Sequence, residues 1–235
     1  MITSIHQPSF FPWLGLLDKI AKSNTFVFLN DVPANKASYQ YRNIFYCAGD
    51  SKFLSLPVDY RLGMKINDLR FKNDIWRIDH LNKIKNYYAK APFFDEIFPL
   101  VFDLYSNDVN LTPYEFIKST MKLMLDLYGI NVDLVESSTL SCSETKGDLV
   151  LEICRKTNTR TYLSGKGALN YMSSELLERF EFHGIGIEWQ VFKHPIYNQV
   201  NNIQFVEGLA ALDMLFFCGL DKAKSIFWSN VKSNQ

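Results

Sequence analysis

The first 43 residues alternate short apolar segments with one amphipathic segment, and this order restricts the possible folds more than any other feature of the chain. Residues 1–5 and 25–29 are rich in β-branched and aromatic side chains, which favour short buried strands. Between them lies a segment whose apolar residues recur at helical spacing: Trp13, Leu17, Ile20 and Ala21. The order strand, helix, strand predicts a βαβ unit with a right-handed crossover, and therefore a parallel sheet.

The rest of the chain continues with further strand and helix patterns. We expect strands at residues 53–58, 66–71, 130–135, 161–163 and 185–192. We expect helices at residues 74–90, 113–128, 148–156, 207–218 and 221–231, and one more that begins after Gly167. The predicted fold class is α/β, with a three-layer, mostly parallel sheet and flanking helices. We expect a single domain over residues 1–235, with a helical segment inserted at about residues 74–128.

The predicted helix at residues 113–128 has the clearest boundaries. Thr112 is a preferred N-cap residue, Pro113 fits the first helical position, and Glu115 completes a capping box. Gly129 follows the last apolar residue and predicts a left-handed C-terminal cap.

Composition and charge exclude several classes of protein. The 25 basic residues balance the 25 acidic ones, so there is no overall charge to attract nucleic acid, and we expect no DNA partner. The four cysteines are widely scattered and form no CxxC motif, so we expect neither a zinc site nor a disulfide framework. No segment approaches the ~20 apolar residues of a membrane span, and the start does not resemble a signal peptide. We therefore expect a cytoplasmic protein.

Aromatic residues make up 15% of the chain, which is a high share. One explanation is a core rich in phenylalanine, because aromatic side chains are most often simply buried. The other is a set of stacking platforms for sugars or bases.

Two predicted strands end in polar residues that can carry chemistry. His6 and Gln7 follow the first strand, and Asp31 follows the second. Parallel strands place their carboxyl ends at one edge of the sheet, where α/β proteins bind ligands. His6 is a candidate general base or hydrogen-bond donor to an anion, and Asp31 is a candidate to orient His6, to bind a hydroxyl or to accept a proton from an amine. The alternatives are a hydrogen-bonded structural histidine and an aspartate that caps a turn.

A basic and aromatic group of residues lies near these strand ends: Lys19, Lys36, Tyr39, Arg42 and Asn43. Lysine and arginine together can hold a diphosphate, and arginine does so with two parallel hydrogen bonds. A solvated loop is the alternative interpretation for residues 36–42, because this segment lacks apolar periodicity.

Three later groups are weaker candidates for a site. Ser164-Gly165-Lys166-Gly167 is a small glycine loop at a strand end, where backbone N–H groups can bind phosphate or an oxyanion, although a tight connection explains it equally well. Trp76 and His80 share one helical face, which can be surface or core edge. The third group is polar and aromatic and follows the last strand: His194, Tyr197 and Gln199.

These residues resemble the motifs of the WbqC-like proteins over nearly the whole chain. The most specific part is the opening motif, which consists of His6-Gln7-Pro8, Phe11-Pro12-Trp13, Gly15 and Asp18-Lys19-Ile20. Further matches are Asp31-Val32, Lys36, Tyr39, Arg42-Asn43, Trp76, His80, Tyr88, Ala91-Pro92, Tyr162-Leu163-Ser164-Gly165, Gly167, Tyr171, Gly184-Ile185, His194-Pro195-Ile196-Tyr197, Gln199, Phe205 and Leu212-Asp213. One departure is Ala210-Ala211, where the family tends to carry Leu-Ser, so no hydroxyl function is expected there.

The resemblance implies a transferase that acts on a nucleotide-linked amino sugar in surface-polysaccharide (O-antigen or lipopolysaccharide) biosynthesis. The implied reaction is the transfer of an aminoacyl group, notably glycyl, or of an acyl group onto the sugar amine. The implied partners are the nucleotide-linked amino sugar and an acyl or aminoacyl donor. No cofactor or metal is implied, and a homo-oligomer is left open.

In such a reaction His6, oriented by Asp31, would accept the proton that the attacking amine loses. Lys36, Gln7 or the backbone at Ser164-Gly165 would stabilise the developing oxyanion. The remaining roles concern the nucleotide: Arg42 and Lys19 would hold its diphosphate, and Tyr39 or Trp76 would stack on the base or sugar.

Two other functions remain open from the sequence. The first strand, the Pro-x-x-Gly loop and the lysine-bearing helix also resemble the first βα turn of nucleotidylyltransferases and adenylating ligases, which would use ATP. A non-catalytic nucleotide-sugar binding protein would also account for the aromatic and polar clusters.

Overall fold

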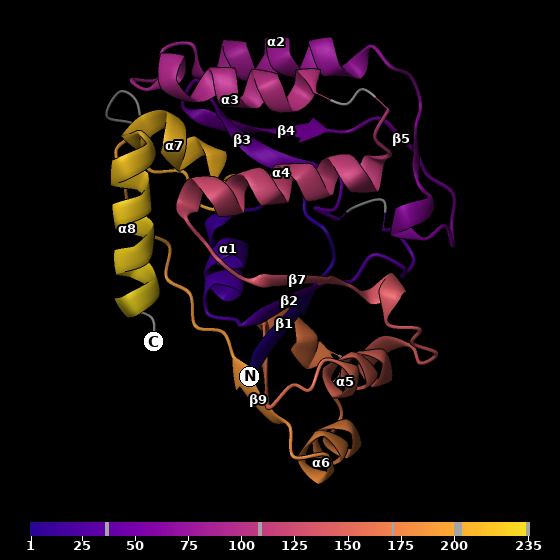
Figure 1. Cartoon of the computed structure of the whole chain (residues 1–235). Helices are drawn as coiled ribbons and strands as arrows, with labels where there is room; N and C mark the ends of the chain where they lie inside the picture. Colours follow the sequence, from indigo (N-terminus) through magenta and orange to yellow (C-terminus); the bar gives the residue numbers. More distant parts are fainter. Residues whose placement is uncertain (36–37, 108–109, 171, 200–203, 234–235) are drawn as a thin grey trace.

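The computed structural model describes residues 1–35, 38–107, 110–170, 172–199 and 204–233. A five-stranded parallel sheet lies at the centre of this described part, with strand order β7-β2-β1-β8-β9 (Figure 1). The strands are β1 (Ile2–His6), β2 (Thr25–Phe28), β7 (Asp133–Glu136), β8 (Thr161–Ser164) and β9 (Gly186–Trp189). The predicted α/β class with a parallel sheet is confirmed.

Helices cover both faces of this sheet. On β2, Phe26 and Phe28 pack in the core that contains α1 (Leu14–Ala21) and α4 (Pro113–Tyr128). Val27 points the other way, into the core formed with α5 (Lys146–Lys156) and α6 (Ser174–Phe182). This alternation is expected because successive strand residues face opposite sides of a sheet.

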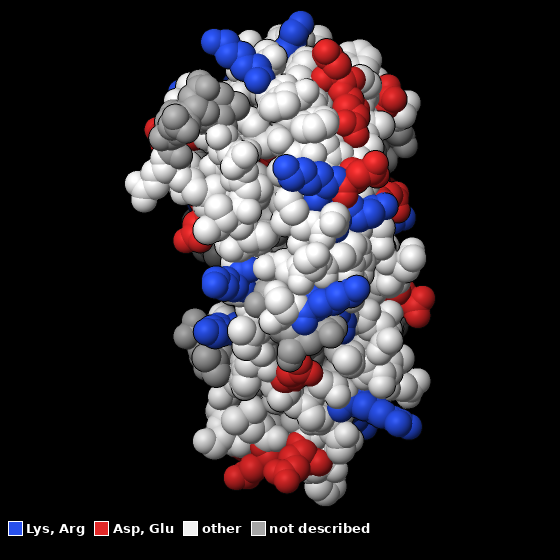
Figure 2. Space-filling view, turned by 90° about the vertical axis from the view of Figure 1, so that its left-hand side faces the viewer, with Lys and Arg blue, Asp and Glu red and all other residues white. Residues whose placement is uncertain are grey.

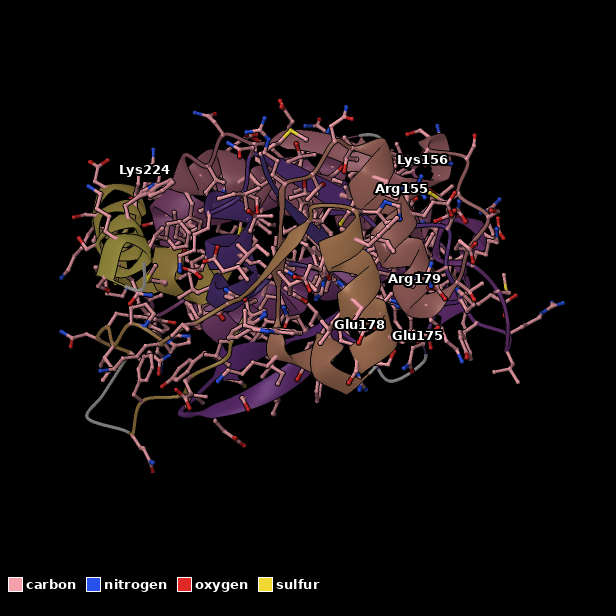
Figure 3. All side chains as sticks on the ribbon, turned by 90° about the horizontal axis from the view of Figure 1, so that it is seen from below. Arg155, Lys156, Glu175, Glu178, Arg179 and Lys224 are labelled. Carbon is pink, nitrogen blue, oxygen red and sulfur yellow. The ribbon has the colours of Figure 1, made fainter. Side chains whose placement is uncertain are left out.

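The pair α5 and α6 forms the lower layer of the molecule. Figure 3 shows these two helices side by side, with Arg155 and Lys156 on α5 and Arg179 on α6. Arg179 forms an ion pair with Asp148 of α5, which joins the two helices at their surface.

The upper part of the molecule holds three helices and two small hairpins. Its elements are α2 (Trp76–Tyr88), α3 (Phe94–Ser106), α4, the hairpin β3 (Arg42–Cys47) with β4 (Asp50–Ser55), and the pair β5 (Val58–Asp59) with β6 (Arg70–Phe71). The C-terminal helices α7 (Leu212–Cys218) and α8 (Leu220–Ser233) lie against one side of it (Figure 1). The helices α2, α3 and α4 occupy the segment where we predicted a helical insertion.

Several predicted boundaries were wrong. The predicted strand at residues 53–58 is divided between β4 and β5, because Pro57 between them has no N–H to donate to a ladder. Residues 66–71 form the short 3-10 helix η1 (Ile66–Asp68) and then β6 rather than one strand. The last strand ends at Trp189, and the helix predicted at 207–218 begins at Leu212.

Two further short helices lie beside the carboxyl ends of strands. One is η2 (Ser137–Thr139), directly after β7, and the other is η3 (Lys166–Asn170), directly after β8. The helix predicted after Gly167 is therefore η3, and the longer α6 begins only at Ser174, where the Ser173 hydroxyl accepts from the Leu176 N–H.

The predicted caps of α4 are confirmed. The N–H of Glu115 donates to Thr112 Oγ1 over 3.3 Å, and the N–H of Thr112 donates to Glu115 Oε2 over 2.8 Å. Gly129 closes the helix with a φ of 66°, a left-handed conformation that glycine adopts without strain.

One face of the molecule carries charged side chains of both signs (Figure 2). On the face shown in Figure 2, lysine and arginine side chains form separate groups with uncharged surface between them, and aspartate and glutamate side chains lie above and below. Among the described residues, no helix has the length and apolar character that crossing a membrane requires.

Candidate functional site

The order in which the chain adds strands to the sheet reverses between β1 and β8. From β1 the chain passes through α1 on one face and adds β2, whereas β8 lies on the opposite side of β1 and leads to α6 on the other face. Because the two following helices separate to opposite faces, a crevice opens beyond the carboxyl ends of β1 and β8. Ligands of α/β proteins bind in crevices of this kind.

Two adjoining cavities occupy this crevice. The Val150 cavity has a volume of about 400 Å³ and is lined by Ile5, His6, Gln7, Lys19, Leu29, Val150, Tyr162, Ser164, Gly165, Gly167 and Ala168. The Trp13 cavity has a volume of about 370 Å³ and is lined by His6, Trp13, Gly15, Leu16, Lys19, Gly165, Lys166, Gly167, Gln190, Val191 and Phe192. His6 and Lys19 line both, so any two ligands in these cavities would meet at this pair.

His6 is the last residue of β1 and is exposed at the base of both cavities. Its Nδ1 lies 2.7 Å from the backbone carbonyl of Gln7, so this nitrogen carries the proton and Nε2 is the acceptor in the neutral ring. His6 has access to solvent only through these cavities, and the surrounding protein desolvates its imidazole; this desolvation and the neighbouring charge of Lys19 both lower the pKa of His6 well below its usual value. The imidazole is therefore neutral at pH 7 with Nε2 as a hydrogen-bond acceptor, and the lowered pKa makes it a weaker base than a free histidine.

Lys19 is a buried cation on α1, with only 4% of its surface exposed. Its Nζ donates to the carbonyl oxygen of Ile5 over 3.2 Å, and no carboxylate among the described residues forms an ion pair with it. Desolvation lowers the pKa of Lys19 to about 8. A buried ammonium with a carbonyl as its protein partner is costly unless an anion also binds there.

Helix α1 carries Asp18 and Lys19 next to each other, and both are buried. Asp18 Oδ2 accepts from Lys22 Nζ over 3.0 Å and from Gln190 Nε2 over 2.8 Å. Gln190 also donates to the carbonyl of Gly15 over 2.7 Å, so it ties the start of α1 to the end of β9. Burial is the main reason that the pKa of Asp18 is raised, although these hydrogen bonds oppose the shift.

The sequence prediction did not include Gln190 as a site residue. Gln190 directly follows β9, so the rule that site residues lie at strand ends applies to it as well. The predicted strand at residues 185–192 contains Gln190 in its interior, whereas the observed strand ends at Trp189.

The indole of Trp13 lies directly over Gly15. A Cβ atom on Gly15 would lie 2.3 Å from Trp13 Cη2, far inside van der Waals contact. Trp13 itself is 38% exposed and contacts Phe192 edge to face at 5.2 Å, so the two rings form one wall of the Trp13 cavity. The Trp-x-Gly spacing of the opening motif thus shapes this cavity.

We expect Gly15→Ala to displace the Trp13 ring and to lower the free energy of unfolding by about 1–3 kcal/mol, the usual cost of overpacking. Chemical denaturation and tryptophan fluorescence would measure both effects. In a Trp13→Ala background the clash is gone, and Gly15→Ala should then stabilise α1 by up to about 1 kcal/mol through helix propensity. An equal cost in both backgrounds would contradict this account.

The glycine loop after β8 lines both cavities through Gly165 and Gly167, whereas buried Ser164 lines the Val150 cavity. A Cβ atom at either glycine would meet nothing within 4 Å. Packing against protein therefore does not explain these two glycines, and their lack of a side chain leaves room in the cavities instead. Lys166 of the same loop lines the Trp13 cavity.

Gln7 lines the Val150 cavity and accepts at Oε1 a hydrogen bond from Gln40 Nε2 over 2.8 Å. Asn43 is buried and donates to the carbonyls of Phe10 and Phe11 at 3.1 and 2.6 Å, so it holds the aromatic loop that follows Gln7.

Tyr39 and Arg42 lie on the far side of that loop, beside the β3–β4 hairpin. The Arg42 guanidinium stacks on Phe53 at 4.5 Å from the ring centroid, and Tyr39 lies against the same ring. Neither residue lines the two cavities.

In the described part of the chain, Asp31 and His6 form their hydrogen bonds with different partners. Asp31 accepts a hydrogen bond from the Ser137 hydroxyl at the start of η2. The same cluster contains Asn30, whose Nδ2 donates to Glu136 Oε2 over 3.0 Å and to the Ser138 hydroxyl over 3.1 Å. Asp31 therefore belongs to a separate polar group at the ends of β2 and β7. Lys36, the third predicted catalytic residue, lies outside the described residues.

Trp76 and His80 lie in the aromatic core of the upper part. His80 Nδ1 is 3.1 Å from the Tyr105 hydroxyl and Nε2 is 3.0 Å from the carbonyl of Ser55, which occupies both ring nitrogens. Trp76 stacks on Phe71 at 4.5 Å. Burial lowers the pKa of His80 to about 4, as expected for a neutral histidine within a packed core.

Tyr197 and Gln199 converge on Asp213 of α7, which is fully buried. Its Oδ2 accepts from the Tyr197 hydroxyl over 2.7 Å and from Gln199 Nε2 over 3.0 Å, and its Oδ1 accepts from the Tyr88 hydroxyl over 3.0 Å. Desolvation raises the pKa of Asp213 to about 6.

His194 lies beside the Trp13 cavity wall, with its ring 5.9 Å from that of Phe192.

A larger hollow of about 680 Å³ lies at the opposite edge of the sheet, around Asn24, Lys122 and Asp133. Its wall has no buried lysine or histidine among the described residues, and it shares no lining residue with the two cavities of the crevice. No group of three or more His, Cys, Asp or Glu residues in the described ranges is arranged to hold a metal ion.

Comparison with known proteins gives one match. The model of the WbqC-like protein family matches residues 7–225. No curated protein and no solved structure is significantly similar to the chain.

Proposed function

The chain belongs to the WbqC-like protein family, and from that premise we propose that it is a transferase that moves an acyl or aminoacyl group onto the amine of a nucleotide-linked sugar in surface-polysaccharide biosynthesis. The observation that supports this proposal is the position of His6 and Lys19, which line both adjoining cavities. A group transfer needs two substrates to meet at one set of proton-active side chains. One cavity for each substrate provides that arrangement.

The proposed reaction forms an amide between the sugar nitrogen and the acyl carbon. The amine attacks the acyl carbon and loses a proton to Nε2 of neutral His6, while the carbonyl oxygen becomes negative. The bond between the acyl carbon and its carrier then breaks, and protonated His6 returns the proton to the leaving group. We assign stabilisation of the oxyanion to Gln7 and to the backbone at Gly165, which line the Val150 cavity.

Mass spectrometry of the reaction products tests this proposal. The protein is incubated with a nucleotide-linked amino sugar and a panel of donors that includes glycine with ATP, acyl-CoA and aminoacyl-tRNA. We expect a sugar product whose mass is raised by one acyl or aminoacyl group with one of these donors. Absence of any such product across the panel would count against the proposal.

The ATP-dependent alternative has one supporting observation, because two lysines, Lys19 and Lys166, line the Trp13 cavity and could hold the phosphates of ATP. Release of pyrophosphate from ATP and glycine before the sugar is added would identify an adenylating ligase. A transferase that uses a preformed donor would release none.

A further inference from the structure

The two cavities have different walls, although they share His6 and Lys19. The Val150 cavity has aliphatic side chains from Ile5, Leu29 and Val150. The Trp13 cavity has the two contacting rings of Trp13 and Phe192. Flat aromatic surfaces favour flat or ring-shaped ligands. The aromatic Trp13 cavity and the aliphatic Val150 cavity are therefore suited to different ligand groups.

Positive charge is also distributed unequally. The Trp13 cavity has the buried ammonium of Lys19 at its base and the exposed lysine Lys166 on its wall, whereas the Val150 cavity has Lys19 alone. Lys19 is more than nine-tenths buried, and its protein partner is a neutral carbonyl oxygen. A ligand anion at this point would supply the opposite charge that the surrounding protein does not.

The mouth of the Trp13 cavity also keeps apolar surface in contact with solvent. Val191 is 64% exposed and Trp13 is 38% exposed, and both line the cavity beside Phe192. The cavity therefore combines an anion-binding base with an aromatic, partly exposed rim. A nucleoside diphosphate matches this arrangement. Its phosphates fit the anion-binding part of the cavity, and its base, which is separated from them by a sugar, fits the aromatic rim.

We infer that the Trp13 cavity binds the nucleotide part of the sugar substrate, with the diphosphate at Lys19 and Lys166 and the base against Trp13 and Phe192. The acyl group then occupies the Val150 cavity. This inference rests on the proposed function for the identity of the substrate, but the binding site itself is tested without turnover.

Calorimetry with uridine diphosphate, guanosine diphosphate, inorganic pyrophosphate and uridine as probes tests the site. We expect Lys19→Met to weaken binding of both nucleoside diphosphates and of pyrophosphate at least about tenfold, because a charge-assisted contact is lost. Trp13→Ala should weaken the nucleotides severalfold but leave pyrophosphate unchanged. Lys224→Met, on the distant helix α8 (Figure 3), is the matched control and should change nothing.

A pH series assigns the anion contact to Lys19. Affinity of the wild type for uridine diphosphate should fall as pH rises from 7 to 9, because the ammonium of Lys19, with a pKa of about 8, loses its proton. Other titratable groups around Lys19 are Asp18 on its own helix, His6 of β1, Tyr162 of β8 and Lys166 of η3. Lys19→Arg keeps all of these and a permanent charge, so its affinity should not fall over this range.

The outcomes separate this inference from the proposed function. Equal affinities in wild type and Lys19→Met, with both proteins folded by thermal melting, would overturn the inference. Transfer to an amino sugar without detectable nucleotide binding would also overturn it and leave the function intact. Nucleotide binding as described, with no transfer from any donor, would support the site and reject the transferase.

Discussion

Replacing His6 with alanine is expected to lower the rate of transfer about 10²–10⁴-fold, the usual contribution of a general base. Stability should change little, because the side chain is exposed in the cavities and its one described polar contact is with the adjacent Gln7 carbonyl. Single-turnover measurement of amide formation, together with thermal melting, would check both statements.

The matched control for His6 is His183, an exposed histidine at the end of α6 and outside both cavities. His183→Ala should retain full activity. Full activity in folded His6→Ala would show that another group accepts the proton and would remove His6 from the mechanism.

The pH dependence of the rate provides a second test of His6. A free histidine gains its proton near pH 6.5, but enclosure and Lys19 lower the pKa of His6. A lowered pKa keeps the imidazole neutral at more acidic pH, so the rate should not fall between pH 7 and pH 6 through protonation of His6. Loss of half the activity at pH 6.5, absent in a variant lacking the imidazole, would contradict this.

Replacing Asp213 with alanine is expected to lower the free energy of unfolding by about 3–5 kcal/mol at pH 7. The carboxylate accepts hydrogen bonds from Tyr88, Tyr197 and Gln199, and its removal leaves two buried hydroxyls and one half-buried amide without this acceptor. Urea unfolding would measure the loss. Glu178→Ala, which removes an exposed carboxylate on α6 (Figure 3), should change stability by less than about 0.5 kcal/mol.

Asp213 also makes a distinct contribution to the pH dependence of stability. Its pKa is raised from 3.8 to about 6 in the folded protein, chiefly by desolvation, so folding favours the protonated form. The stabilisation is therefore fully present below pH 4 and is lost as pH rises through 6. The free energy of unfolding of the wild type, minus that of Asp213→Asn, should therefore increase when pH is lowered from 7 to 5. A difference that stays constant would contradict the raised pKa.

Local sequence patterns were sufficient to predict much of the fold. The βαβ unit at the start, the capping box at Thr112 and the cap at Gly129 depend on side chains close in sequence, and all three were predicted and are present. The β3–β4 hairpin was not predicted, because residues 42–47 have no clean alternation of apolar and polar side chains. The bounds of helix α3 were not predicted either. Pro99 lies inside this helix, and a proline normally indicates the end of a helix.

The candidate site was predicted only in part. His6, Gln7, Lys19, Ser164 and Gly165 were predicted from strand ends or from the opening motif, and they line the cavities. Two other sets of predicted residues meet elsewhere: Trp76 with His80 in the aromatic core, and Tyr197 with Gln199 on Asp213. A shared helical face or a short loop brings polar and aromatic groups together, but it does not say whether they face a cavity or a packed interior.

The sequence by itself determined the parallel α/β sheet, the family, and the edge of the sheet at which His6 lies, because each depends on the order of local patterns. Only the tertiary structure decided the state of Lys19. The stripe of Trp13, Leu17 and Ile20 predicts a helix with one buried face, and Lys19 is not part of that stripe. The structure instead buries every residue of α1 from Leu14 to Ile20, and the helix lies between the sheet and α4 (Figure 1). Lys19 is buried by segments distant in the sequence, and that burial lowers its pKa.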